Sequence, residues 1–182
     1  MTRSQALRQP SIILDLAAVP APPPPALAPS PPSGPSPPPA PPTPGGPRWL
    51  LGRSDGTATL ASLTPDGLTP GLTPLLTLRG HRGAVVSVSA STDGATLLTG
   101  GTDGTARLWD ARDGRPLAVL RGHRDAVFAV APSPDGRRVV TASADGQALL
   151  FDAQSGAALR VLAGHQGAVR AARFSPDGTF VM

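Results

Sequence analysis

Short apolar runs separated by Asp-Gly turns follow one another through the C-terminal three quarters of the chain. They recur in two consecutive stretches, at residues 84–90, 95–99, 105–110 and 117–120, and again at 126–131, 137–141, 147–152 and 159–162. Asp-Gly favours a tight hairpin because its residues tolerate the positive φ angles that such a turn needs. Each stretch is therefore predicted to be an antiparallel meander of four strands.

The whole pattern repeats with a period of 42 residues. Gly80-His81, Gly122-His123 and Gly164-His165 are spaced by this interval and contain the three histidines of the chain. When aligned on these pairs, residues 80–121 and 122–163 agree at 20 of 42 positions. A period in the low forties made of short strands is typical of units that bury their faces against neighbouring units.

Incomplete units and a proline-rich stretch flank the two full repeats. Residues 48–79 are predicted to be a degenerate repeat entered at its second strand, and residues 164–182 to begin a further repeat with a strand at 168–174. Residues 20–47 hold 16 of the 24 prolines, so a disordered, extended linker is expected there. Residues 1–19 are expected to be disordered, and Asp15 inside their apolar run argues against a signal peptide.

These motifs resemble those of the WD-repeat family, which has Gly-His before the first strand, Asp-Gly after the second, and Trp-Asp, here Trp109-Asp110, ending the third. The resemblance covers residues 48–182 and implies an all-β fold of β-propeller blades behind a disordered proline-rich arm. A closed propeller has about 4 to 8 blades, so an incomplete ring is expected. A fragment of a longer protein is the favoured explanation; a ring completed between chains and an open arc are the alternatives.

The resemblance also implies a buried hydrogen-bonded network within each repeat. Its expected members are His81, Thr99, Asp103 and Trp109 in one repeat, and His123, Thr141 and Asp145 in the next. In such a network a carboxylate accepts from the imidazole, the imidazole from a hydroxyl, and the hydroxyl from an indole. Phe151 stands where the second repeat would need tryptophan, so that network is expected to lack the indole donor.

A histidine, an aspartate and a threonine in proximity would also fit a hydrolase triad. A catalytic group occurs once and opens to substrate, whereas this set recurs with the repeat, so a structural role is predicted. One histidine per unit keeps the imidazoles too far apart to share a metal ion, and no phosphate-loop spacing occurs. We therefore expect no enzyme activity, no catalytic residue, no cofactor and no metal.

The charge balance introduces a nucleic-acid alternative. Lys and Arg number 16 against 12 Asp and Glu, and every one of these residues is Arg or Asp. The arginines are scattered and often adjoin an aspartate, as Arg124 adjoins Asp125, which favours a solvated mixed surface over a phosphate-binding groove. The lack of cysteine fits a reducing compartment, cytoplasmic or nuclear, and no stretch reaches the about 20 apolar residues that a membrane span needs.

The resemblance implies a non-catalytic scaffold whose loops contact other proteins or peptides. The expected contact residues lie around the loop before each first strand and the turn after each second strand; they are Arg82, Arg124, Asp125, Gln166 and Arg170. Proline-binding modules are possible partners of the proline-rich arm, because polyproline II segments dock with little loss of entropy. The rival hypotheses are a regulatory appendage of a larger enzyme and an arginine-rich nucleic-acid-binding module.

Overall fold

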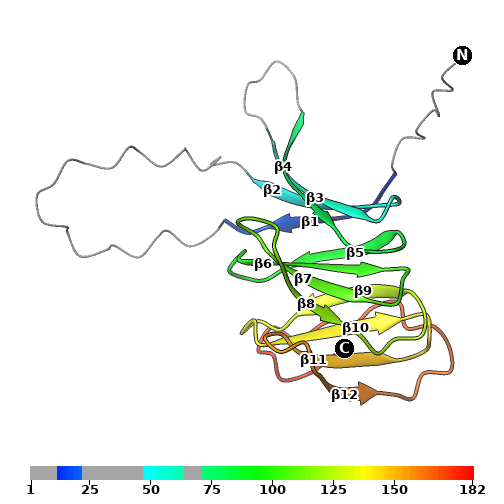
Figure 1. The fold of residues 1–182 in the computed structure, drawn as a ribbon. Helices are drawn as coiled ribbons and strands as arrows, with labels where there is room; N and C mark the ends of the chain where they lie inside the picture. Colours follow the sequence, from blue (N-terminus) through cyan, green and yellow to red (C-terminus); the bar gives the residue numbers. More distant parts are fainter. Residues whose placement is uncertain (1–11, 22–46, 64–70) are drawn as a thin grey trace, which may run out of the picture.

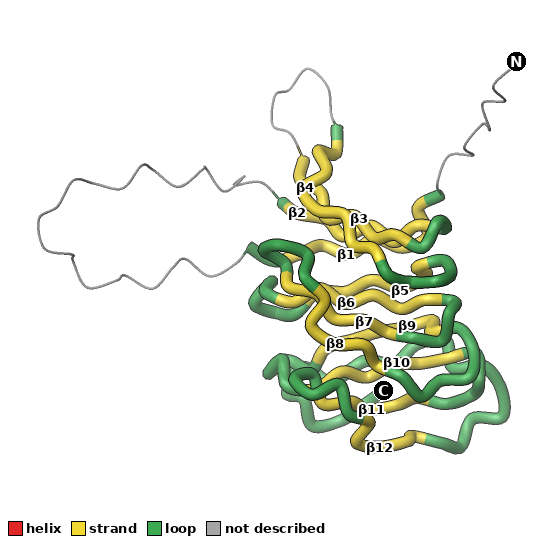
Figure 2. Tube along the Cα trace, viewed as in Figure 1, coloured by secondary structure: helices red, strands yellow, loops and turns green. Residues whose placement is uncertain are grey.

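The computed structural model describes residues 12–21, 47–63 and 71–182 (Figure 1). Over these residues the chain forms three four-stranded antiparallel sheets and contains no helix (Figure 2). The all-β prediction is confirmed. Most of the proline-rich stretch, residues 22–46, lies outside the described residues, as does the loop at 64–70, so the linker expected at 20–47 is described only at its two ends.

Each sheet is a meander in which strands adjacent in the sequence are adjacent in space. The first sheet contains β1 (Ile13–Val19), β2 (Arg48–Arg53), β3 (Thr57–Leu63) and β4 (Leu72–Arg79). The second contains β5 (Val85–Ala90), β6 (Thr96–Gly101), β7 (Ala106–Asp110) and β8 (Pro116–Leu120). The third contains β9 (Val127–Pro132), β10 (Arg138–Ser143), β11 (Ala148–Asp152) and β12 (Ala158–Leu162). The second and third sheets fall inside the repeats at 80–121 and 122–163.

The expectation of a disordered N-terminal segment is wrong over residues 13–19. These residues form β1, which pairs antiparallel with β2 from Ile13 opposite Arg53 to Val19 opposite Arg48. The unit at 48–79, expected to lack its first strand, is therefore part of a full sheet that receives this strand from before the proline-rich stretch. Local patterning could not show the pairing, because 28 positions separate Pro20 from Arg48.

The three sheets stack face to face, and their first strands, β1, β5 and β9, lie side by side (Figure 1). We call these three the inner strands, and we call the strands at the opposite edge of each sheet, β4, β8 and β12, the outer strands. Side-chain hydrogen bonds cross from one inner strand to the next. Asp15 Oδ2 accepts a bond of 2.7 Å from the Val88 amide, and Ser87 Oγ lies 3.2 Å from the Val130 amide. Asp15 and Ser87 hold equivalent positions, since each faces a glycine of its neighbouring strand.

Apolar side chains fill the spaces between the sheets. Those between the first and second sheets include Leu50, Leu60, Leu97 and Trp109, and those between the second and third include Leu98, Leu108, Val139 and Phe151. Glycine allows the sheets to approach closely. A Cβ atom at Gly52 would lie 2.8 Å from the Val85 carbonyl oxygen, and one at Gly100 would lie 3.0 Å from that of Val127.

The segment after β12 covers part of the third sheet. Val169 and Ala172 pack with Val140 and Ala142 in the apolar cluster on this side. The strand predicted at 168–174 is reduced to a single bridge between Phe174 and Val181, closed by the turn at 177–178. A ladder needs a partner along its length, and in this hairpin only residues 180–182 face the first arm.

Candidate functional site

The four residues expected in the first network lie in one hydrogen-bonded group. His81 Nδ1 is 3.1 Å from both carboxylate oxygens of Asp103, and His81 Nε2 is 2.8 Å from Thr99 Oγ1. Trp109 Nε1 donates to the same Thr99 oxygen at 2.9 Å. The side chains of His81 and Asp103 are 1% and 11% exposed, so the group is sealed inside the sheet.

The partners fix the protons in this group. The Asp103 carboxylate can only accept, so His81 Nδ1 carries the hydrogen, and Nε2 accepts from the Thr99 hydroxyl. The Thr99 oxygen then accepts from the indole. Burial lowers the pKa of His81 below its ordinary value, although the Asp103 carboxylate acts in the opposite direction. Because burial prevails, the imidazole is neutral. Every side chain in the set therefore has a hydrogen-bond partner inside the sheet.

Asp103 also organises the surrounding backbone. Its oxygens accept from the Arg82 amide at 2.9 Å and from the Thr105 hydroxyl at 2.8 Å, in addition to His81. Burial alone would raise the pKa of this carboxyl, but these hydrogen bonds outweigh burial and lower the pKa to about 2. Thr105 was not anticipated from the sequence, although Asp55-Gly56-Thr57 and Asp103-Gly104-Thr105 repeat the same turn; Asp55 Oδ1 likewise accepts from the Thr57 hydroxyl.

The second repeat forms the same group without the indole. His123 Nδ1 lies 3.0 Å from Asp145, and His123 Nε2 lies 2.7 Å from the Thr141 hydroxyl. The side chains of His123 and Asp145 are 2% and 8% exposed. Burial of Asp145 is again outweighed, here by bonds from the Arg124 amide and His123, so the pKa of this carboxyl is lowered. Phe151 is buried but donates nothing, as the sequence indicated.

The third histidine is in a different situation. His165 is exposed, and the described part of the chain shows no hydrogen bond to its ring. Two of the three histidines are therefore structural supports, while the third is on the surface.

Each buried network holds an exposed loop in place. The Arg82 amide is bound by Asp103 and the Arg124 amide by Asp145, both at 2.9 Å. The amide of Thr102 also donates to the Ala84 carbonyl, so the loop before the inner strand lies against the turn after the second strand. We call this side of the sheets the loop end; it comprises residues 79–84, 102–105, 121–126 and 144–147, and lies on the right in Figure 2.

The five expected contact residues are all exposed. Arg82, Arg124 and Asp125 belong to the loop end. Gln166 occupies the position of Arg82 in the third repeat. Arg170 lies over the ring of Phe128, with its guanidinium carbon 5.6 Å from the ring centre.

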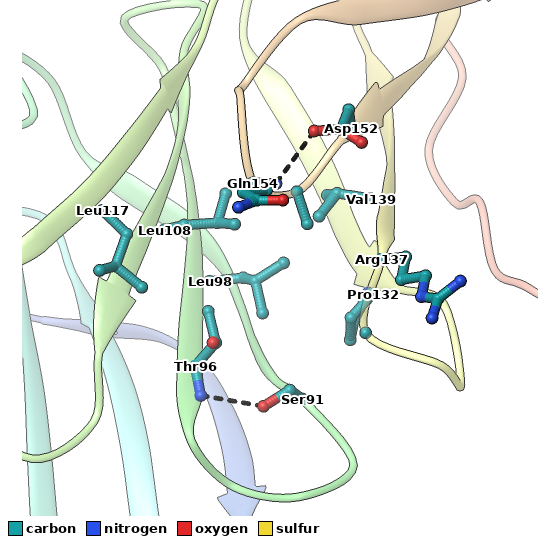
Figure 3. A pocket seen from close by; sticks show the side chains of 12 residues that line it. Ser91, Thr96, Leu98, Leu108, Leu117, Pro132, Arg137, Val139, Asp152 and Gln154 are labelled. Atoms are coloured by element: carbon teal, nitrogen blue, oxygen red, sulfur yellow. Dashed lines mark hydrogen bonds between the residues drawn. The ribbon is translucent and has the colours of Figure 1, made fainter.

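A cleft between the second and third sheets opens at the opposite end (Figure 3). It has a volume of about 460 Å³, and Leu98, Leu108 and Val139 line its interior. Polar groups in its wall form hydrogen bonds within turns: the Gln154 amide donates to Asp152, and the Thr96 amide donates to Ser91. No histidine is among the residues that line it.

Family models of the WD domain, G-beta repeat, match residues 72–110, 114–152 and 156–182, together more than half of the chain. The chain belongs to the WD-repeat family. Each complete match begins with the outer strand of one sheet and ends with the third strand of the next sheet. The match at residues 72–110, for example, contains β4 of the first sheet and then β5, β6 and β7 of the second. One WD repeat in the sequence therefore contributes strands to two neighbouring sheets and joins them covalently.

Curated relatives match over about one repeat each. The chain is 53% identical over 45 residues to ribosome biogenesis protein YTM1 of Pyricularia oryzae, covering 24% of this chain and 9% of that protein. It is 47% identical over 53 residues to ribosome biogenesis protein ERB1 of Chaetomium thermophilum, covering 29% and 7%. For WD repeat-containing protein 86 of Homo sapiens the identity is 57% over 35 residues, covering 19% and 9%. The matches span less than a tenth of each of these relatives.

The described residues contain no helix that is both long and apolar enough to cross a membrane. In the same residues, no group of three or more histidine and acidic side chains is placed to hold a metal ion.

Proposed function

We propose that this WD-repeat chain is a non-catalytic scaffold for protein interactions and that its contact surface is the loop end. One observation carries the proposal. The carboxylates that bind the buried histidines also bind the amides of Arg82 and Arg124, so each network presents an exposed arginine at the same place in successive sheets. Surface loops held by a rigid framework are well suited to recognition.

The alternative of a hydrolase receives no support from the geometry. A triad needs a histidine that reaches both a nucleophile and a substrate. The side chains of His81 and His123 are 1% and 2% exposed, so neither ring is open to a substrate. The same arrangement occurs twice, which supports a role in holding loops.

We further propose that the chain acts inside the cell, in the cytoplasm or the nucleus. Two of the matched relatives are named ribosome biogenesis proteins, and the chain has no cysteine to form a disulfide. Binding of proline-rich residues 20–47 to proline-recognition modules remains a separate proposal that rests on the sequence alone. Imaging of the tagged protein in its own cells tests the location; secretion would contradict it.

Site-specific photo-crosslinking in those cells tests the proposed contact surface. A photoreactive phenylalanine analogue replaces Arg82 or Arg124 at the loop end, or Arg112 or Gln154 at the opposite end. All four side chains are exposed, and all four backbone amides are bound by an aspartate, so the positions are matched. Crosslinks to other proteins are expected mainly from positions 82 and 124. Equal or stronger crosslinking from the opposite end would contradict the proposal.

A further inference from the structure

The loop end carries four arginines, none of which has an aspartate within ion-pair distance of 4.0 Å among the described residues. The motif Arg-Gly-His-Arg occurs at residues 79–82 and again at 121–124, and all four arginines are exposed. In the described part of the chain, the ion pairs within 4.0 Å are the two between histidine and aspartate, so none of these arginines is paired. Arg124 and Asp125 adjoin without pairing, since Asp125 Oδ1 instead accepts from the Ala126 amide at 2.7 Å.

The turn carboxylates at the loop end are already occupied. Asp103 accepts from a backbone amide, a hydroxyl and an imidazole, and Asp145 accepts from the Arg124 and Gln147 amides and from His123. Their side chains are only 11% and 8% exposed. Such carboxylates cannot also bind the neighbouring guanidinium groups, which remain available to an external anion.

The distance between the two loops determines how far apart the negative charges of that anion must lie. Arg82 and Arg124 follow equivalent histidines in adjacent sheets and are held by equivalent bonds of 2.9 Å. Stacked sheets lie about 10 Å apart. A chain in the extended polyproline II conformation rises about 3.1 Å per residue with three residues per turn, so side chains three residues apart point to the same side, about 9 Å apart. Carboxylates at such positions would therefore suit both guanidinium groups, each of which can bind a carboxylate through two parallel hydrogen bonds.

We propose that the loop end binds an extended acidic segment of a partner protein, with carboxylates at positions i and i+3. Arg79, which ends β4, and Arg121, which follows β8, extend the basic strip toward the outer edge of the sheets. Single-stranded nucleic acids stack their bases on exposed aromatic rings. Trp109, the aromatic residue that borders Gly80, is 2% exposed, so the surface suits carboxylates better than bases. This proposal rests on the proposed function and adds the chemistry of the partner.

Binding of a defined peptide to the full chain tests the proposal. The probe is a short fluorescein-labelled peptide with glutamate at every third position, and its control has glutamine at those positions. At low salt the glutamate peptide should bind, and R82Q/R124Q should weaken it about tenfold or more, because charged bidentate bonds are lost. The backbone bonds to Asp103 and Asp145 do not involve these side chains, so the variant should retain its thermal stability.

The matched control is R112Q/R115Q in the turn between β7 and β8, at the opposite end. Both side chains are exposed and both amides are bound by aspartates, as at the loop end. This variant should change the affinity less than about twofold, as expected for weakly coupled surface charges. R82E/R124E should reverse the preference and bind the same peptide carrying lysine in place of glutamate.

Three results would overturn the proposal: equal weakening by both double variants, equal binding of the glutamine peptide, or tighter binding of a single-stranded RNA of mixed sequence. Failure of the peptide together with retained protein crosslinks from positions 82 and 124 would reject the acidic segment alone. Failure of both the peptide and the crosslinks would reject the proposed function as well.

Discussion

The carboxylate of Asp15 accepts a hydrogen bond of 2.7 Å from the backbone amide of Val88, 73 positions away in the sequence. This bond joins β1 of the first sheet to β5 of the second. Around it, Val19 is buried at 5% exposure, whereas Leu14 and Leu16 on the other face of β1 are 43% and 54% exposed. Asp15 is therefore a specific link that holds the N-terminal strand on the stacked sheets.

Replacing Asp15 with alanine should destabilise the chain by about 1–3 kcal/mol, because the Val88 amide loses its acceptor. Asp15→Asn keeps a side-chain oxygen and should lose less. Urea unfolding measures both, with Leu16→Ala on the exposed face of β1 as the control. Equal stability of Asp15→Ala and the wild type would show that the bond does not hold β1.

Close contact between the sheets makes two glycines sensitive to substitution. Alanine at position 52 or 100 would place its Cβ 2.8 Å or 3.0 Å from a carbonyl oxygen of the next inner strand. Each change should cost about 1–3 kcal/mol, as for overpacked cores, measured by thermal unfolding. Gly167→Ala, where no atom lies within 4 Å of the added carbon, should be nearly neutral. Similar melting temperatures for all three variants would contradict the close stacking.

The indole of the first network should contribute measurable stability. Trp109→Phe removes the 2.9 Å bond to Thr99 and should cost about 1–3 kcal/mol, because a donor is lost and a smaller ring packs less well. A double-mutant cycle with Thr99→Val separates the bond from the packing, and it should show coupling of about 1 kcal/mol. The equivalent cycle between Thr141 and Phe151, with Phe151→Leu, supplies the comparison. Equal coupling in the two repeats would deny the indole any special role.

Acid should destabilise the fold in two pH windows. Burial lowers the folded-state pKa of His81 below the ordinary 6.5, so its contribution is complete above that value and falls as the pH drops below it. Asp103, opposed by burial but bound by the Arg82 amide, Thr105 and His81, has its pKa lowered from 3.8 to about 2. Its contribution is complete above 3.8 and is lost as the pH falls through about 2.

Urea unfolding at a series of pH values measures these windows. His81→Gln should flatten the stability profile below about pH 6.5, because one of the groups that titrates there is gone. Asp103→Asn should flatten the more acidic part. A wild-type profile that gains stability on acidification would contradict the assignment of a neutral, buried His81.

The sequence revealed the features that recur and missed those that do not. The 42-residue period located the second and third sheets, and the Gly-His and Asp-Gly pairs named the residues that meet in both buried networks. β1 was missed because its partner strand lies beyond the proline-rich stretch, and its apolar run has no clear alternation. Asp15 was interpreted only as a charge that disfavours a signal peptide, since nothing local indicates a bond across 73 positions.

The sequence predicted where the loops lie but not the hydrogen bonds of their aspartates. Neighbouring arginines and aspartates suggested a solvated mixed surface. In the fold, Asp103, Asp145 and Asp125 bind backbone amides instead, which leaves Arg82 and Arg124 unpaired among the described residues. Capping preferences of aspartate in turns compete with ion pairing, and only the folded geometry shows which prevails.

The central claim is that His81 and His123 are buried supports that hold the loops, and nitrogen-15 NMR of the imidazole rings tests it most directly. The chain has three histidines, so the spectrum is simple, and exposed His165 is an internal reference. At neutral pH, His81 and His123 should both carry their hydrogen on Nδ1 and exchange it slowly with water, unlike His165. Three rings with the same tautomer mixture and the same rapid exchange would contradict the account.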